Sequence, residues 1–167
     1  PYEMGLIKNK YVGRTFIQPT QEMREQGVRM KLSAVSSIVK GKRVVMIDDS
    51  IVRGTTSKRI VRLLKEAGAI EVHVRIASPA IKYPCFYGVD MSTMDELISN
   101  RLNVNELCNY IEADSLAFIT EEGIDKSIHF NKEKHKCSLC LACFNGEYVT
   151  NLYDSFEMDK IKKGKEY

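Results

Sequence analysis

The stretch RVVMIDDSIVRGTTS, residues 43–57, decides the expected fold and the expected site. It opens with a short apolar run rich in β-branched residues, which is typical of a parallel strand buried on both faces. Two carboxylates follow at once, then an Arg-Gly turn and three hydroxyl residues. An apolar pattern of helical period continues from there and stops at Gly68, a usual helix end. The order predicts a strand, a loop and a helix.

The loop between this strand and helix has the chemistry of a sugar-phosphate site. Open α/β folds bind ligands at the carboxyl edge of the sheet, and a helix N-terminus suits a phosphate. Paired carboxylates repel phosphate, so we expect them to face sugar hydroxyls and Mg2+. A solvated acidic pair before an ordinary helix cap is the alternative, which this context disfavours. The expected substrate-binding residues are Asp48, Asp49, Ser50, Arg53, Gly54, Thr55, Thr56 and Ser57.

Two stretches carry a resemblance to a known family. IDDSIVRGTTS resembles the phosphoribosylpyrophosphate-binding motif of type I phosphoribosyltransferases, and KNKYVGRTFIQPTQEMREQGVRMKLS, residues 8–33, resembles the glutamine phosphoribosylpyrophosphate amidotransferase family. The resemblance implies an α/β fold of the type I phosphoribosyltransferase kind, a mainly parallel sheet flanked by helices, with a C-terminal helical, cysteine-containing extension. It implies transfer of ammonia to C1 of phosphoribosylpyrophosphate, giving 5-phosphoribosylamine and pyrophosphate, in the first step of de novo purine synthesis.

The resemblance also assigns roles to residues. Asp48 and Asp49 would stabilise positive charge on the ribose ring and help bind the magnesium complex. The polar, glycine-punctuated stretch through Met30 would be a catalytic loop that closes over the substrate. Its candidate contacts to pyrophosphate are Arg14, Arg29 and Lys31, for which solvated charges are the alternative. The expected catalytic residues are thus Asp48, Asp49, Arg14 and Lys31.

The cysteines indicate a second site. The run from Cys137 through Cys140 to Cys143 contains two overlapping Cys-x-x-Cys pairs, whose thiolates can share one metal. Soft thiolates favour iron–sulfur or zinc over magnesium, with structural thiols or a redox pair as alternatives. The resemblance implies a [4Fe–4S] cluster on Cys85, Cys137 and Cys140, with a fourth ligand outside this chain and Cys143 as a substitute. Cys108 lies on an apolar helical stripe and is interpreted as core.

Bulk properties set the broad class. The chain has 167 residues, 44% of them hydrophobic, and a net charge of +3. That balance gives no reason to expect nucleic acid or a membrane as partner, and the absence of a signal peptide predicts a cytoplasmic protein. We expect a phosphoribosyltransferase core over 1–130 and a cysteine-containing extension over 131–167. The resemblance implies a homo-oligomer, purine nucleotides as inhibitors, and a glutaminase domain before Pro1, so this chain alone should not use glutamine.

Periodicity places the remaining elements. Strands are expected over Tyr2–Lys8, Glu71–Ala77 and Ser115–Ile119, besides Arg43–Asp48. Helices are expected over Ser33–Val39, from a capping box at Thr93 through Asn100, and over Asn103–Ala113 and Glu121–Ile128. His73, on the polar face of its strand, is either a general base or, more in keeping with a lone strand histidine, a half-buried structural residue.

Two other functions compete with the transferase. A nucleotide- or phosphoribosylpyrophosphate-sensing regulator would keep the fold and the Asp-Asp loop but lose the catalytic loop. A thiolate–metal interaction module would depend on the cysteines and leave the Asp-Asp loop incidental.

Overall fold

The computed structural model describes residues 1–8, 32–89, 94–128 and 139–150. Two strands near the start, β1 and β2, pair antiparallel, and three later strands form a parallel sheet in the order β3-β4-β5. The elements in chain order are β1 (Leu6–Lys8), β2 (Leu32–Ala34), α2 (Ser36–Val39), β3 (Arg43–Asp48), α3 (Thr55–Glu66), β4 (Glu71–Ile76), η1 (Met94–Glu96), η2 (Ile98–Asn100), α4 (Val104–Tyr110), β5 (Ser115–Phe118), α5 (Glu121–Ser127) and α6 (Ala142–Asn145).

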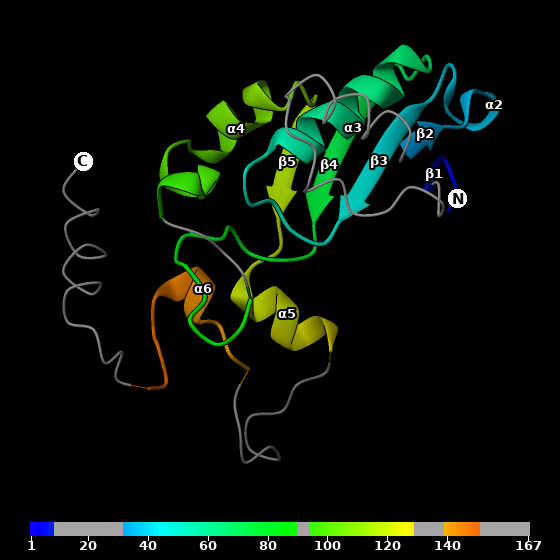
Figure 1. The fold of residues 1–167 in the computed structure, drawn as a ribbon. Coiled ribbons are helices and arrows are strands. Elements are labelled where there is room, and N and C mark those ends of the chain that lie inside the picture. The colour runs from blue at the N-terminus through cyan, green and yellow to red at the C-terminus, as the bar shows by residue number, and fades with distance from the viewer. Residues whose placement is uncertain (9–31, 90–93, 129–138, 151–167) are drawn as a thin grey trace.

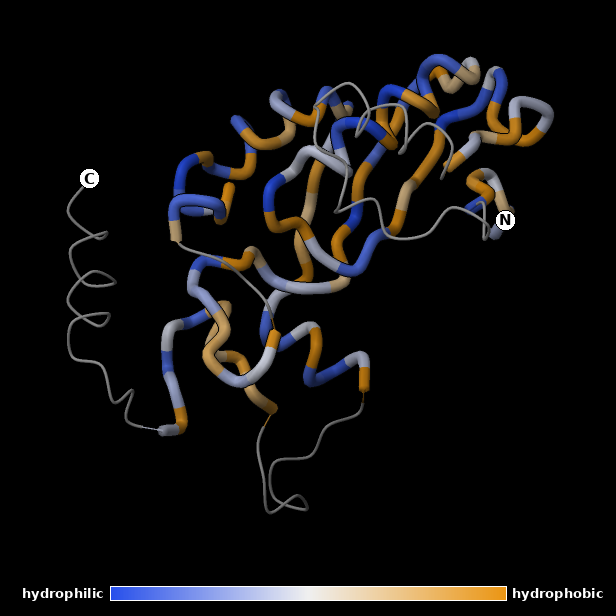
Figure 2. The backbone as a smooth tube through the Cα atoms, viewed as in Figure 1, coloured by the Kyte–Doolittle hydropathy of each residue, from blue (hydrophilic) through white to orange (hydrophobic). Residues whose placement is uncertain are grey.

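The core lies between the parallel sheet and helices α3 and α4, which lie on one side of it (Figure 1). In register, Met46 of β3 is opposite Val74 of β4, which is opposite Leu116 of β5. Side chains of alternate strand residues therefore point to the helices together. Hydrophobic residues run through the strands in the middle of the molecule (Figure 2). Among the most deeply buried residues of the core are Val61, Leu64, Val72, Val74, Leu107 and Ile111.

The opposite face of the sheet corrects one expectation. β3 was expected to be buried on both faces, but the side chains of Val45 and Ile47 are 60% and 72% exposed. No described element covers this face, so only alternate residues such as Met46 are removed from water. A parallel sheet is ordinarily covered on both sides, and the apolar run of β3 was interpreted on that basis.

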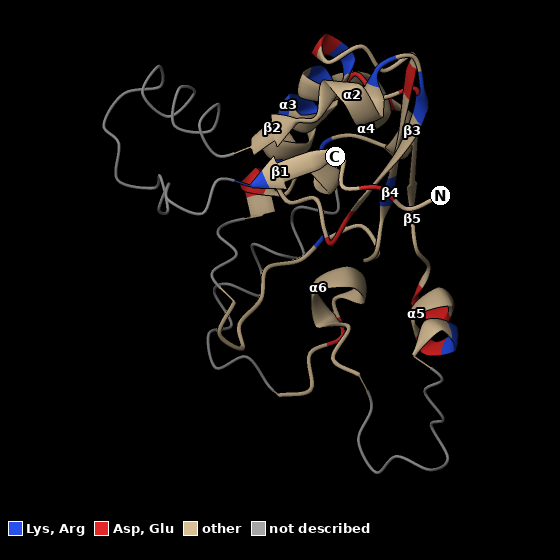
Figure 3. Ribbon diagram, turned by 90° about the vertical axis from the view of Figure 1, so that its right-hand side faces the viewer, with Lys and Arg blue, Asp and Glu red and all other residues tan. Residues whose placement is uncertain are grey.

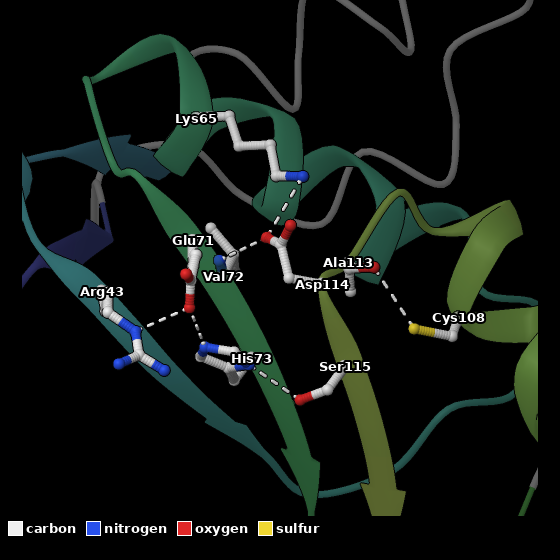
Figure 4. A network of polar contacts seen from close by, with 9 residues as sticks. All are labelled: Arg43, Lys65, Glu71, Val72, His73, Cys108, Ala113, Asp114 and Ser115. Carbon is white, nitrogen blue, oxygen red and sulfur yellow. Dashed lines mark hydrogen bonds and ion pairs between the residues drawn. The ribbon is translucent and has the colours of Figure 1, made fainter.

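A hydrogen-bonded row occupies part of this uncovered face (Figure 4). Glu71 Oε2 accepts from Arg43 Nε at 2.6 Å and lies 2.8 Å from His73 Nε2. His73 Nδ1 lies 2.8 Å from Ser115 Oγ. Both ring nitrogens of His73 thus have partners, Glu71 on the same strand and Ser115 on the neighbouring β5, near the amino ends of the strands. This arrangement supports the structural interpretation of His73 over a general base.

Helices α3 and α4 are tied together through Glu112, which follows α4. Arg62 of α3 donates two hydrogen bonds to the Glu112 carboxylate, one of them from Nε at 2.8 Å, and Lys58 Nζ lies 3.4 Å away. The Arg62 hydrogen bond is the main reason why the pKa of Glu112 falls to about 2. The same Lys58 lies over the Tyr110 ring, 4.6 Å from its centroid.

The helices also differ in charge: α3 is mainly basic and α5 mainly acidic (Figure 3).

Most expected elements are confirmed, and two are wrong. The expected helix over Ser33–Val39 begins as a strand, because Leu32–Ala34 pairs with Leu6–Lys8. The expected helix through Asn100 is two short 3-10 turns, η1 and η2. The capping box expected at Thr93 falls outside the described residues, and a complete capping box formed by Asn103 and Glu106 starts α4. The sequence pattern within a few residues cannot distinguish a strand or a 3-10 turn from the expected helix, because strand pairing and capping depend on the neighbouring segments.

The last described elements lie beyond the carboxyl ends of the strands (Figure 1). α5 follows β5 directly, and Thr120 caps it by accepting a hydrogen bond from the Gly123 amide. α6 packs against the segment after β4, because the amides of Lys82 and Tyr83 both donate to the Cys143 carbonyl at 3.0 Å. The expected domain boundary at residue 130 falls within 129–138, outside the described residues. Within the described ranges, no helix is both long enough and apolar enough to cross a membrane.

Candidate sugar-phosphate site

The segment 49–57, named the phosphate loop after its expected role, runs from the carboxyl end of β3 into the first turn of α3. Its position is fixed by β3 pairing with β4 up to Asp48, whose carbonyl accepts a hydrogen bond from the Ala77 amide at 2.9 Å. Ile51 is almost fully buried and anchors the loop to the core. The sequence prediction of a strand, loop and helix at the carboxyl edge of a parallel sheet is confirmed.

The two carboxylates lie at the start of this loop in different environments. Asp48 is half-buried and accepts a hydrogen bond from the Asp49 amide at 3.0 Å, while Asp49 is exposed and accepts from Ser50 Oγ at 2.5 Å. Burial is the main cause that raises the pKa of Asp48, and the charge of Asp49 adds to it. Two acids held so close favour a cation or hydroxyl donors as their partner.

The helix that follows begins without a side-chain cap. Gly54 is its N-cap, with φ of 73°, and has no side chain that could accept from the first amides. The first turn holds no acidic residue, and the side chains of Thr55 and Thr56 are exposed. The amides and the positive end of the helix dipole are therefore arranged to receive an anion. Ser57 differs from expectation, because its side chain is buried at 3% exposure and only its backbone suits this role.

Arg53 makes a contact that motif reasoning did not identify. Its Nη2 donates to Glu96 Oε2 of η1 at 2.6 Å. The two residues are 43 positions apart. The sequence marked Glu96 only as the acidic residue of the capping box expected from Thr93, and nothing in it linked Glu96 to Arg53. Arg14, Arg29 and Lys31, the expected pyrophosphate contacts, lie outside the described residues.

The thiols of Cys85, Cys140 and Cys143 gather near α6. Cys85 Sγ accepts a hydrogen bond from the Tyr87 amide at 3.4 Å. Burial is the main cause that raises the pKa of the Cys143 thiol, and the neighbouring Cys85 and Cys140 raise it further. Within the described ranges, no group of three or more His, Cys, Asp or Glu is placed to hold a metal ion. Cys137 lies outside those ranges, and Cys108 instead donates to the Ala113 carbonyl.

Aromatic side chains surround the Cys85 turn. The Tyr148 hydroxyl donates to the Pro84 carbonyl at 2.7 Å, and its ring lies 5.2 Å from that of Phe86. Burial is the main cause that raises the pKa of Tyr148 to about 12. The turn is thus packed against the segment after α6.

Relatives of this chain share its sequence over almost its full length. It is 59% identical over 163 residues to the amidophosphoribosyltransferase of Bacillus subtilis. The matched stretch is 98% of this chain and 34% of the relative. It is 57% identical over 154 residues to the enzyme of that name from Staphylococcus aureus. That matched stretch is 92% of this chain and 31% of the relative. The chain therefore spans about a third of the length of these curated relatives.

A solved structure shares the fold. It is described as the glutamine phosphoribosylpyrophosphate amidotransferase of Bacillus subtilis complexed with ADP and GMP. Its TM-score is 0.78 at 61% identity, over 92% of this chain and 34% of that one. The type I phosphoribosyltransferase fold expected from the sequence is thus confirmed. Residues 4–95 match the family model described as the phosphoribosyl transferase domain, which is more than half of the chain. The chain therefore belongs to the phosphoribosyl transferase domain family.

Proposed function

We propose that this chain supplies the phosphoribosyl-binding part of an amidophosphoribosyltransferase. The reaction is transfer of ammonia to C1 of phosphoribosylpyrophosphate, which releases pyrophosphate. The observation that carries the proposal is the uncapped N-terminus of α3, reached directly from two adjacent acids at the edge of a parallel sheet. That arrangement matches the two ends of a ribose 5-phosphate, and the relatives named for this activity are 57–59% identical to this chain over 154–163 residues.

Each part of the loop has a separate task in this reaction. The amides from Gly54 onward and the hydroxyls of Thr55 and Thr56 hold the phosphate, which fixes the ring for attack at C1. Asp48 and Asp49 accept from the ribose hydroxyls, and their charge stabilises the oxocarbenium-like transition state. The same two carboxylates would hold Mg2+, which supplies positive charge against the leaving pyrophosphate. The raised pKa of Asp48 fits this role, because a bound cation would offset the repulsion between the acids.

A binding titration tests this proposal directly. The purified chain should bind ribose 5-phosphate with Mg2+ in isothermal titration calorimetry, and ribose should bind at least about tenfold more weakly because it lacks the phosphate. GMP should compete with ribose 5-phosphate, since the two share the sugar phosphate and a relative's structure is described with ADP and GMP. Equal affinities for ribose and ribose 5-phosphate would refute the assignment of the phosphate loop.

We further propose an iron–sulfur cluster at the thiol group near α6. Cys85 and Cys140 are two of the expected ligands, and Cys137, the third, lies outside the described residues. Cys143 is a further candidate ligand, because its carbonyl accepts hydrogen bonds from the amides of Lys82 and Tyr83, which come just before Cys85 in the chain. The Tyr87 amide that donates to Cys85 Sγ would stabilise a thiolate there. Such a cluster would hold the two chain segments together.

Reconstitution with ferrous iron and sulfide under anaerobic conditions checks this proposal. Cys85→Ser should lose most of the visible absorbance and the bound iron, because a hydroxyl is a poor substitute for a soft thiolate. Cys108→Ser is the matched control and should retain both, since Cys108 is bonded within the core to the Ala113 carbonyl. Loss of iron in Cys143→Ser but not in Cys137→Ser would assign Cys143 as a ligand. Equal iron in Cys85→Ser and the unmodified chain would exclude the cluster.

A further inference from the structure

We infer that Glu96 is a positioning residue for the phosphate loop, an inference that rests on the function proposed above. Glu96 comes from η1, a turn that lies outside the sugar-phosphate motif of the sequence. Its carboxylate holds the Arg53 guanidinium immediately before the N-cap of α3, with 2.6 Å between Oε2 and Nη2. The pair therefore links a remote segment to the place where the phosphate is expected.

The pair is unsuited to a stabilising role for the fold. Its side chains are 51% and 41% exposed, and ion pairs that face water contribute little to the free energy of folding. Arginine has a long side chain whose freedom is costly to lose when it binds a ligand. A carboxylate that holds the planar guanidinium in place removes part of that freedom before the ligand arrives. The effect of Glu96 should therefore appear in binding and not in stability.

The segment that carries Glu96 supports three successive loop residues. The Ile98 amide donates to the Val52 carbonyl at 2.9 Å, and Glu96 holds Arg53. At Gly54, an added Cβ would lie 3.0 Å from Ile98 Cδ1, which shows how closely that side chain packs on the loop. Of these three contacts, the Glu96 pair is the one that a substitution can remove without disturbing the core. The segment Met94–Asn100 thus acts as a support for the start of α3.

Calorimetric titration of the whole chain with ribose 5-phosphate and Mg2+ tests this role. Glu96→Gln should weaken binding roughly fivefold, about the value of one solvent-facing charged contact. Glu96→Asp should recover part of the loss, because it restores the charge. Asp95→Asn, the matched control, removes the same charge from the exposed neighbouring residue and should leave the affinity unchanged. The melting temperature of Glu96→Gln should stay within a few degrees of the unmodified chain.

Hydrogen exchange without ligand supplies a second readout. In Glu96→Gln the amides of residues 53–57 should exchange faster, while those of β4 keep their protection. If the unmodified chain and Glu96→Gln bind ribose 5-phosphate alike, only this inference is overturned. If the unmodified chain does not bind ribose 5-phosphate, the proposed function fails and the inference fails with it. Equal losses in Asp95→Asn and Glu96→Gln would assign the effect to general charge and also overturn the inference.

Discussion

Asp48→Asn should abolish most sugar-phosphate binding and at the same time stabilise the fold. An amide cannot hold Mg2+ or accept from ribose hydroxyls as a carboxylate does, so affinity for ribose 5-phosphate with Mg2+ should fall roughly 10-fold to 100-fold. The fold should gain stability because the half-buried Asp48 carboxylate is disfavoured there, as its raised pKa indicates. Its Oδ1 contact with the Asp49 amide survives in the variant, since the asparagine oxygen also accepts.

The pH dependence of the stability of Asp48→Asn follows from the direction in which folding shifts the pKa of Asp48. The pKa of Asp48 is higher in the folded chain than its usual 3.8, so folding favours the protonated acid. The benefit of protonation is fully present below 3.8 and is lost as the pH rises through the folded pKa. Asp48→Asn should therefore melt at a higher temperature than the unmodified chain near neutral pH, and the difference should shrink as the pH falls toward 3.8.

Calorimetry and thermal melts over a pH series measure both effects. Glu122→Gln is a matched control, because Glu122 is an exposed acid on α5 whose neighbour at i+4, Lys126, lies 3.9 Å away, and because it is remote in sequence from the phosphate loop. It should change neither the affinity nor the pH dependence. An Asp48→Asn chain that is less stable at neutral pH, or that binds ribose 5-phosphate normally, would contradict the assignment of Asp48 as a functional acid held at a cost to the fold.

Gly54→Ala should be the most damaging single-methyl change in the phosphate loop. Gly54 has φ of 73°, where an alanine costs roughly 1–2 kcal/mol. Its new Cβ would also lie 3.0 Å from Ile98 Cδ1 and 3.1 Å from Tyr110 Cε1, so the loop or these side chains must shift. Because the same residue is the N-cap of α3, the shift should move the amides that receive the phosphate and weaken binding roughly tenfold or more.

Gly41→Ala separates the cost of backbone strain from the cost of the contacts that an added Cβ makes at Gly54. Gly41 has nearly the same φ, 74°, but an added Cβ there meets nothing within 4 Å. It should lose stability from backbone strain alone and keep normal affinity for ribose 5-phosphate. Urea unfolding and calorimetry on both variants provide the comparison. Similar losses of stability and unchanged binding in Gly54→Ala and Gly41→Ala would show that the contacts of the Cβ added at Gly54 with Ile98 and Tyr110 are unimportant.

The central unit of β3, phosphate loop and α3 could be read from the sequence because its signals are local. A β-branched run, a helical period and a glycine at the turn each act within a few residues. The same locality explains the errors. Leu32–Ala34 is a strand because it pairs with β1, and the segment expected as a helix through Asn100 contains two short 3-10 turns instead.

The strand, loop and helix that place Asp48 and Asp49 before the start of α3 were therefore determined by the sequence alone, through short-range backbone preferences and residue chemistry. The tertiary structure alone decided that Glu96 holds Arg53, that Cys143 lies beside the Cys85 turn, and that one face of β3 is exposed. These features join segments tens of residues apart. Such contacts form when packing brings the segments together, and no local pattern encodes which side chains will meet.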